Sequence, residues 1–221
     1  MNDRTHLTKD NLILRGVVVE VTCLIADFQV KQNQRASTCN QTMETSLDFQ
    51  QALIESIHTA ASFDHAIELV VTAFAQFGQW DYGEVWIPSS EQYCLDLHPA
   101  SYISTALDPT ATIAVQQFQT CTKGFVFGSG VGLPGRVWAS GQPEWLNDAA
   151  SQSESRFLRH YIAKAFGIRT GFGVPVRASD RVLAVLIFFT LVERAADADL
   201  MRSLTELSTE IGGSVASQFS R

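Results

Sequence analysis

The hydrophobic and polar positions follow helical and strand-like periods along most of the chain, and they predict an α+β domain. Apolar residues at helical spacing over 47 to 61 predict a first helix. A second helix is expected between the capping residue Ser62 and Gly78, which ends it. Two strand-like runs, 81 to 88 and 93 to 104, then flank the polar stretch SSEQ and predict a β-hairpin.

Three further helices are expected in the middle of the chain. Asp108 and Pro109 supply a capping side chain and then a fixed backbone angle, which is a typical helix start. A helix of under two turns is expected from Pro134 until Gly141, before the strand-like sequence EWLN. A longer helix is expected over residues 153 to 166.

The last part of the chain predicts a second hairpin and a long helix. Residues 169 to 192 contain two apolar runs around a polar turn. The run from 182 to 191 is almost wholly apolar, so we expect a central strand that is covered on both faces. The closing helix carries one apolar stripe: Leu200, Leu204, Leu207, Ile211, Val215 and Phe219.

The first 45 residues have a different pattern and predict a separate segment. A short amphipathic helix is indicated by Val18, Val21, Ile25 and Phe28, and a polar, weakly patterned linker follows it. Residues 1 to 45 are therefore interpreted as a helix and linker. They are either a connector to an upstream module or a dimer helix, or else a poorly ordered leader or the product of a misplaced start codon. Residues 46 to 221 are expected to form one domain.

Charge and hydropathy exclude two classes of partner. The net charge is -7, and residues 36 to 122 contain ten acidic side chains and no Lys or Arg, whereas residues 123 to 221 carry eleven basic and nine acidic ones. A chain without a basic stripe is not expected to bind nucleic acid. Residues 12 to 30 have the length of a membrane span but contain three charged side chains, so no membrane helix is predicted.

The cysteines predict a reducing compartment. The four thiols are scattered without a CxxC pair and follow no recognisable signal peptide: Cys23, Cys39, Cys94 and Cys121. We therefore expect a cytoplasmic protein with reduced cysteines.

The string GVGLPG, from Gly130 to Gly135, matches the GxGxxG spacing of a dinucleotide-binding loop. A dinucleotide fold needs a crossover helix that is long enough to return the chain parallel to its first strand. The helix expected after this string has fewer than two turns, which argues against a dinucleotide site. The three glycines are instead interpreted as positions of positive φ or close packing.

The order of these elements resembles the GAF domain, a family of small-molecule-sensing and dimerising modules. The strings FDHAIELVV, WDYGEVW, GVGLPGRVWASGQPEWLND, VLAVLIFF and LTELSTEIG are similar to GAF domains of bacterial multi-sensor histidine kinases and related signalling proteins. The resemblance covers about residues 47 to 219. It implies a central antiparallel sheet, with the terminal helices on one face and a pocket formed by the middle segments on the other.

The resemblance also implies several ligand classes, and each can be compared with the residues of this sequence. Bilin-binding relatives use a cysteine followed by histidine or an Asp-x-Cys-Phe motif, whereas here Cys94 precedes Leu95 and Cys121 precedes Thr122, which argues against a covalent bilin. Free methionine sulfoxide reductases have a Gly-Val-Cys-Gly string, and residues 130 to 133 lack that thiol. No histidine has a metal-ligand spacing such as HExxH, so neither a metal nor a cofactor is expected.

A ligand pocket would be lined by the middle segments. Aromatic walls are expected from Trp138, Trp145 and Phe157, and partners for a carboxylate or phosphate from Arg136, Arg159 and Arg169. The alternative interpretation places the aromatic residues in an ordinary core and the arginines on the surface. Asp148 is expected to cap a helix rather than to contact a ligand.

The resulting hypothesis is a non-catalytic regulatory or sensory GAF module. It would bind a small ligand, form a homodimer through its terminal helices, or do both, and act on a signalling kinase or another output protein. Two alternatives stay open: a ligand-free dimerisation and scaffold module whose own Phe and Trp side chains fill the pocket, or a truncated remnant of a sensor histidine kinase. A thiol-based redox enzyme is a more distant alternative.

Overall fold

The computed structural model describes residues 39–89 and 93–219. The helix expected around residues 18 to 28 lies outside the described residues. The first described helix, α2 (Cys39–His58), begins inside the stretch that was expected to be a linker.

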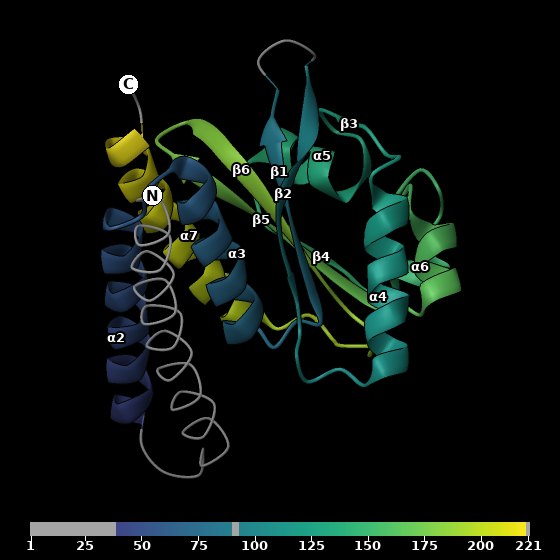
Figure 1. The fold of residues 1–221 in the computed structure, drawn as a ribbon, viewed down its shortest axis with the longest axis horizontal. Helices are drawn as coiled ribbons and strands as arrows, with labels where there is room; N and C mark the ends of the chain where they lie inside the picture. The colour runs from purple at the N-terminus through teal and green to yellow at the C-terminus, as the bar shows by residue number, and fades with distance from the viewer. Residues whose placement is uncertain (1–38, 90–92, 220–221) are drawn as a thin grey trace, which may run out of the picture.

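A six-stranded antiparallel sheet forms the centre of the domain (Figure 1). Its strands are β1 (Tyr82–Pro88), β2 (Cys94–Ile103), β3 (Phe127–Gly128), β4 (Glu144–Leu146), β5 (Thr170–Ala178) and β6 (Arg181–Thr190). Their spatial order is β3-β2-β1-β6-β5-β4. The two predicted hairpins, β1–β2 and β5–β6, are confirmed, and β1 joins them by pairing with β6 so that Tyr82 lies opposite Phe189.

Helices cover both faces of the sheet (Figure 1). On one face α3 (Phe63–Phe77) and α7 (Ala198–Phe219) pack against the strands, and α2 packs against both helices. On the other face lie α4 (Pro109–Thr122), α5 (Gly132–Ser140), the short η1 (Ala149–Ser151) and α6 (His160–Phe166). The α+β architecture with terminal helices on one face is thereby confirmed.

The sheet separates two hydrophobic cores, and β6 contributes to both. Leu186 and Phe188 belong to the core beneath α2, α3 and α7, here named the terminal-helix core. Val185, Ile187 and Phe189 belong to the core beneath α4, α5 and α6, here named the pocket-side core. Because successive strand residues point to opposite faces, an uninterrupted apolar run is what a strand buried on both faces requires.

The apolar stripe of α7 packs inside the molecule. Leu204, Leu207, Ile211 and Val215 are all part of the terminal-helix core. Gly212 allows a close approach to β5, because a Cβ atom there would lie 1.9 Å from the carbonyl oxygen of Arg177. These four side chains of the stripe are therefore used in packing within the monomer.

The glycines of GVGLPG shape a tight turn, as the sequence predicts. Gly130 and Gly132 have φ values of 79° and 64°, which favour glycine. A Cβ atom at Gly135 would lie 2.1 Å from the carbonyl oxygen of Gly128. Two backbone hydrogen bonds close the turn, since the amide of Gly130 donates to the Gly135 carbonyl and the amide of Val131 donates to that of Gly128.

Two helix starts differ from the prediction. α5 begins at Gly132, two residues before Pro134. α6 begins at His160 rather than at residue 153, because residues 153 to 157 form local turns that place Phe157 in the pocket-side core. The ends were predicted correctly, since Gly141 and Gly167 take left-handed conformations as helix caps.

Within the described ranges, none of the helices combines the length and the apolar character that a bilayer crossing demands.

Candidate functional site

A buried ion pair lies between the sheet and helices α4 and α6. Arg159, which precedes α6, is 1% exposed, and Glu84 of β1 is fully buried. The Arg159 Nη1 donates a hydrogen bond of 3.0 Å to Glu84 Oε2, and Nη2 lies 2.7 Å from Oε1. Nη1 also donates to Thr122 Oγ1 at 3.0 Å, and Trp86 Nε1 donates to Glu84 Oε1 at 2.8 Å. The carboxylate thus has partners at both of its oxygens.

Aromatic rings surround the guanidinium of Arg159. Its Cζ atom lies 5.0 to 5.9 Å from the ring centroids of Trp86, Phe118, Phe127, Phe157 and Phe189. The faces of aromatic rings attract cations, more strongly where water is excluded. These five rings and the carboxylate of Glu84 are named the cation cage below.

The alternation of β1 explains why an acidic side chain is buried here. Tyr82, Glu84 and Trp86 point to the pocket side because side chains on one face of a strand recur every second residue. A buried carboxylate is costly without a partner, and Arg159 supplies that partner from a position 75 residues away. The sequence offered one signal that was not used, since an acidic residue occupies a core-facing position of a strand in WDYGEVW.

A chain of hydrogen-bonding side chains leads from this ion pair toward the surface. The Tyr82 hydroxyl lies close enough to the side chains of Glu84 and Gln119 for both to influence its pKa. Gln119 Nε2 donates to Ser101 Oγ at 2.9 Å. Burial, together with the nearby charge of Glu84, raises the pKa of Tyr82 well above its usual value, so the hydroxyl stays protonated and can donate.

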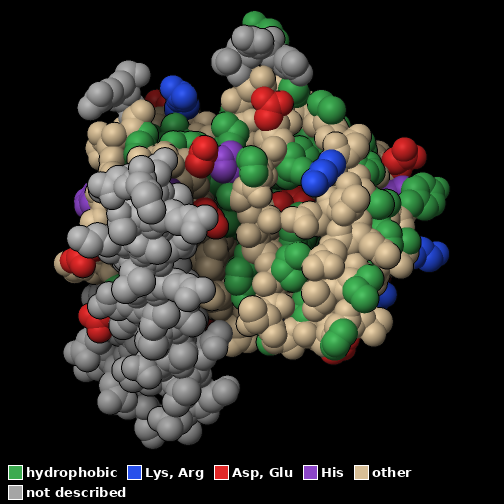
Figure 2. All heavy atoms as spheres, viewed as in Figure 1, with side chains coloured by type: hydrophobic (Ala, Val, Ile, Leu, Met, Phe, Trp, Pro, Cys, Tyr) green, Lys and Arg blue, Asp and Glu red, His purple; other side chains and the backbone are tan. Residues whose placement is uncertain are grey.

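A groove of about 620 Å³ opens where this chain reaches the surface. Figure 2 shows the hollow between β2 and α4, and we name it the β2–α4 groove. Apolar atoms come from Leu95, Leu97, Phe125 and Val126, polar groups from Asp96, Ser101, Gln119 and Lys123, and Tyr82 and Glu84 also line it. Its volume lies in the range of small-molecule sites.

The groove exists because β3 is short. β3 pairs with β2 only at Cys94 and Leu95, so no described strand covers the edge of β2 from Asp96 onward. α4 lies beside that edge and is tied to it by the bond between Gln119 and Ser101. The β1–β2 register also shifts between Glu84 and Trp86, as in a β-bulge.

Of the predicted pocket residues, Phe157 and Arg159 are brought together, in the cation cage. Trp138 of α5 is half-buried against the pocket-side core but is not one of the rings within reach of the guanidinium. Trp145 of β4 lies on the opposite face, in the terminal-helix core, with its ring centroid 5.3 Å from that of Trp80.

The other predicted arginines pair with acidic side chains away from the cage. Arg136 Nη2 lies 2.8 Å from Glu144 Oε1, and its Nε also donates to that carboxylate. Arg169 is partly exposed and lies 3.3 Å from Glu193 and 3.7 Å from Asp148. The prediction that the Asp148 side chain caps a helix is wrong. It precedes η1 with a left-handed φ of 41° and makes no capping hydrogen bond, because its carboxylate turns toward Arg169 instead.

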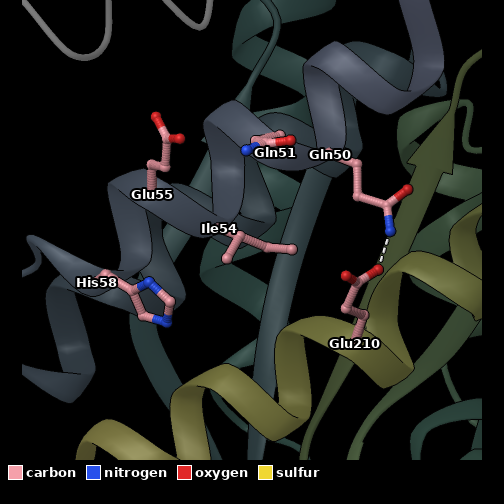
Figure 3. A pocket seen from close by; sticks show the side chains of 6 residues that line it. All are labelled: Gln50, Gln51, Ile54, Glu55, His58 and Glu210. Carbon is pink, nitrogen blue, oxygen red and sulfur yellow. Dashed lines mark hydrogen bonds between the residues drawn. The ribbon is translucent and has the colours of Figure 1, made fainter. Parts of the chain in front are cut away.

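A second, more polar groove lies between α2 and α7 (Figure 3). It has a volume of about 400 Å³ and is lined by Gln50, Gln51, Ile54, Glu55, His58 and Glu210. Gln50 Nε2 donates a hydrogen bond to Glu210 Oε2 across it. Among the described residues that line it, Ile54 is the one apolar side chain, so this surface suits a polar contact better than an apolar ligand.

Metal chemistry finds no support in the side chains that the structure describes. Among residues 39–89 and 93–219, no group of three or more His, Cys, Asp or Glu side chains could hold a metal ion. The string at residues 130 to 133 forms the turn into α5 and contains no sulfur atom.

An antiparallel sheet with terminal helices on one face and short helices over a charged, aromatic core on the other defines a GAF-like class of domain. The chain belongs to the GAF domain family, whose model matches residues 60–215.

Solved structures share this fold at low sequence identity. The GAF domain of a phosphoenolpyruvate-protein phosphotransferase from Coxiella burnetii has a TM-score of 0.59 and 16% identity, over 78% of this chain and 93% of that one. Free methionine-R-sulfoxide reductase from Neisseria meningitidis has a TM-score of 0.58 and 14% identity, over 83% and 93%. Identities this low show the fold alone.

One curated relative matches a short part of the chain. Transcription factor GLABRA 3 from Arabidopsis thaliana is 33% identical over 67 residues, which is 30% of this chain and 10% of that protein. The match spans about a tenth of that relative's length, so it carries no statement about the activity of the whole relative.

Proposed function

We propose that this GAF domain is a non-catalytic sensory module of a cytoplasmic signalling protein and binds a small molecule in the β2–α4 groove. One observation carries the proposal: Tyr82 and Glu84 line the groove, and Glu84 is also the partner of Arg159 in the buried ion pair. A ligand in the groove would therefore touch the same side chains that hold α6 against the sheet.

The regulatory step follows from this connection. A ligand that competes for the hydroxyl of Tyr82 or the amide of Gln119 would change the partners of Glu84, and thereby the position of Arg159 and α6. On the other face, α7 packs closely on β5. We propose that a shift of the sheet biases α7 and is passed to an output protein such as a histidine kinase, as a shift between two conformations of different ligand affinity.

The anion-binding version of the site gains no support from the geometry. The guanidinium of Arg159 is neutralised by Glu84, and that of Arg136 by Glu144. An anionic ligand would have to replace one of these carboxylates.

Native mass spectrometry of protein purified from a near-native host tests the proposal. Leu97→Trp narrows the groove, and Glu206→Trp places the same bulk on an exposed position of α7 as the matched control. We expect an added mass on the wild type and on Glu206→Trp that is absent from Leu97→Trp. Two results would refute ligand binding in this groove: the same added mass on all three proteins, or no added mass on the wild type.

A second candidate function is a ligand-free association module, and the dense aromatic filling of the pocket-side core favours it. The homodimer would then use the outer faces of α2 and α7, including the polar groove of Figure 3. Sedimentation equilibrium at about tens of micromolar, the range of weak association, decides it. A dimer that Ile54→Glu dissociates supports this function, and a wild-type monomer rejects it.

A further inference from the structure

We propose that the cation cage is a binding site for a cationic ligand and that Arg159 occupies it as an internal substitute. The ligand class is an amphipathic monocation with an amidinium-like head and an alkyl tail. This inference rests on the proposed function, because the ligand reaches the cage through the β2–α4 groove.

The chemistry of the cage selects positive charge. Glu84 is fully buried and contributes a full negative charge, and the surrounding groups are aromatic faces. A carboxylate and aromatic faces both stabilise a cation and both disfavour an anion. Arg159 satisfies this demand in the structure described here, so any ligand that takes its place must also carry positive charge.

Arg159 fits the cage imperfectly. Its Nε is buried and, within the described residues, has no hydrogen-bond acceptor. A buried donor without a partner is destabilising. An alkylamidinium keeps two NH2 groups that can face the oxygens of Glu84, and it lacks the third nitrogen, the Nε–H that Arg159 leaves without an acceptor among the rings. The geometry therefore leaves room for a better occupant than the protein's own side chain.

The charge pattern around the entrance favours the same ligand class. β1 and β2 each contain one acidic side chain, Glu84 and Asp96, and neither these strands nor α4 contains a Lys or Arg. Among the described residues that line the groove, Lys123, directly after α4, is basic, and His98 pairs with Asp64. The surrounding potential thus attracts cations toward the groove and disfavours anions.

The β2–α4 groove gives the ligand a path to the cation cage and a place for its alkyl tail. Glu84 itself lines it, and the apolar atoms of Leu95, Leu97 and Phe125 lie along its walls. Arg159 sits at the start of α6, and most side chains of the polar segment 151 to 156 before it are exposed. Arg159 can therefore leave the cage through a movement at the start of α6, with Phe157 kept in the pocket-side core and without breaking a strand pair of the sheet.

Side-chain NMR of ¹⁵N-arginine-labelled protein tests displacement directly. The five nearby rings shift the Arg159 Nε–Hε signal away from those of exposed arginines. We expect hexylamidinium to move this signal to the exposed position at saturation. Hexanoate and hexanol carry the same tail with a negative or neutral head and should bind at least about tenfold more weakly. An Arg159 signal that stays in place when hexylamidinium is raised to the limit of its solubility would overturn the proposal.

Two variants provide a second test. Arg159→Ala removes the internal competitor, so hexylamidinium should bind it more tightly than the wild type, and Glu84→Gln with Arg159→Ala should lose that binding. Hexylamidinium that binds the double variant as tightly as Arg159→Ala would also overturn the cage as the site.

The two proposals can fail separately. A co-purified groove ligand that is anionic, or that leaves the Arg159 signal unmoved, overturns the cation inference and keeps the proposed function. Loss of all binding in the groove overturns both.

Discussion

Replacing Arg159 by methionine tests whether the buried ion pair holds α6 to the sheet. The change keeps an unbranched apolar side chain but removes the contacts with both oxygens of Glu84 and the hydrogen bond to Thr122. Among the remaining bonds of Glu84, the structure then shows the hydrogen bond from Trp86 Nε1, so the buried charge keeps little compensation. Removing one partner of a buried pair costs about 3–5 kcal/mol. For a domain of this size that corresponds to a drop in Tm of roughly 6–20 °C.

The double variant Glu84→Met with Arg159→Met gives the opposite expectation. Replacing both charges by apolar groups is often neutral or stabilising by about 1–4 kcal/mol. Here Trp86 Nε1 loses its acceptor, which costs about 1–3 kcal/mol, so the double variant should unfold near the wild-type midpoint. Two costly single changes and a nearly neutral double change would give a coupling energy of at least about 4 kcal/mol.

Thermal and urea unfolding followed by circular dichroism measures these differences. Arg202→Met is the matched control, because Arg202 pairs with Asp199 on the exposed surface of α7 and such a pair contributes about 0–1 kcal/mol. If Arg159→Met lowers stability no more than Arg202→Met does, the reasoning that the ion pair secures α6 is wrong.

Two further predictions concern the hydroxyl of Tyr82 and the packing of α7. Burial and then the charge of Glu84 raise the pKa of Tyr82 in the folded protein. The contribution of the protonated hydroxyl to stability is therefore complete below the pKa of tyrosine in the unfolded chain, about 10, and is lost as the pH rises above that value. Between about pH 8 and about pH 10.5 the urea midpoint of the wild type should therefore fall more than that of Tyr82→Phe. Equal falls for the two proteins would contradict this prediction. Gly212→Ala should cost about 1–3 kcal/mol, because its Cβ would lie 1.9 Å from the Arg177 carbonyl oxygen. Gly213→Ala should stabilise by about 0.5–1 kcal/mol, since nothing lies within 4 Å of its Cβ, and equal melting temperatures for the two variants would refute this distinction.

Local signals in the sequence predicted much of the fold. Ser62 Oγ accepts a hydrogen bond from the His65 amide, and Asp108 Oδ1 accepts one from the Ala111 amide, as capping residues do. Caps, left-handed glycines and hairpin turns involve residues that are close in sequence, so one sequence is enough to predict them.

Non-local features were not predictable in the same way. The side chain of Trp145 faces the terminal-helix core because β4 pairs with β5 so that Trp145 lies opposite Phe172. That register depends on a contact between distant segments. The Glu84–Arg159 pair likewise joins a strand to a helix start, and sequence reasoning proposed Arg159 as a ligand partner without identifying the carboxylate that neutralises it.

The pairing of β1 with β6 has a consequence for how the chain is made. Tyr82 pairs with Phe189, so the edge of β1 finds its partner only after positions 83 to 189, a further 107 residues, have been synthesised. At about 5–20 residues per second this takes roughly 5–20 s. During that interval a hairpin edge is open to other nascent chains, which is a risk for aggregation. Residues 36 to 122, which include both strands of this hairpin, carry ten acidic side chains and no Lys or Arg, and their mutual repulsion opposes the association of such half-made chains.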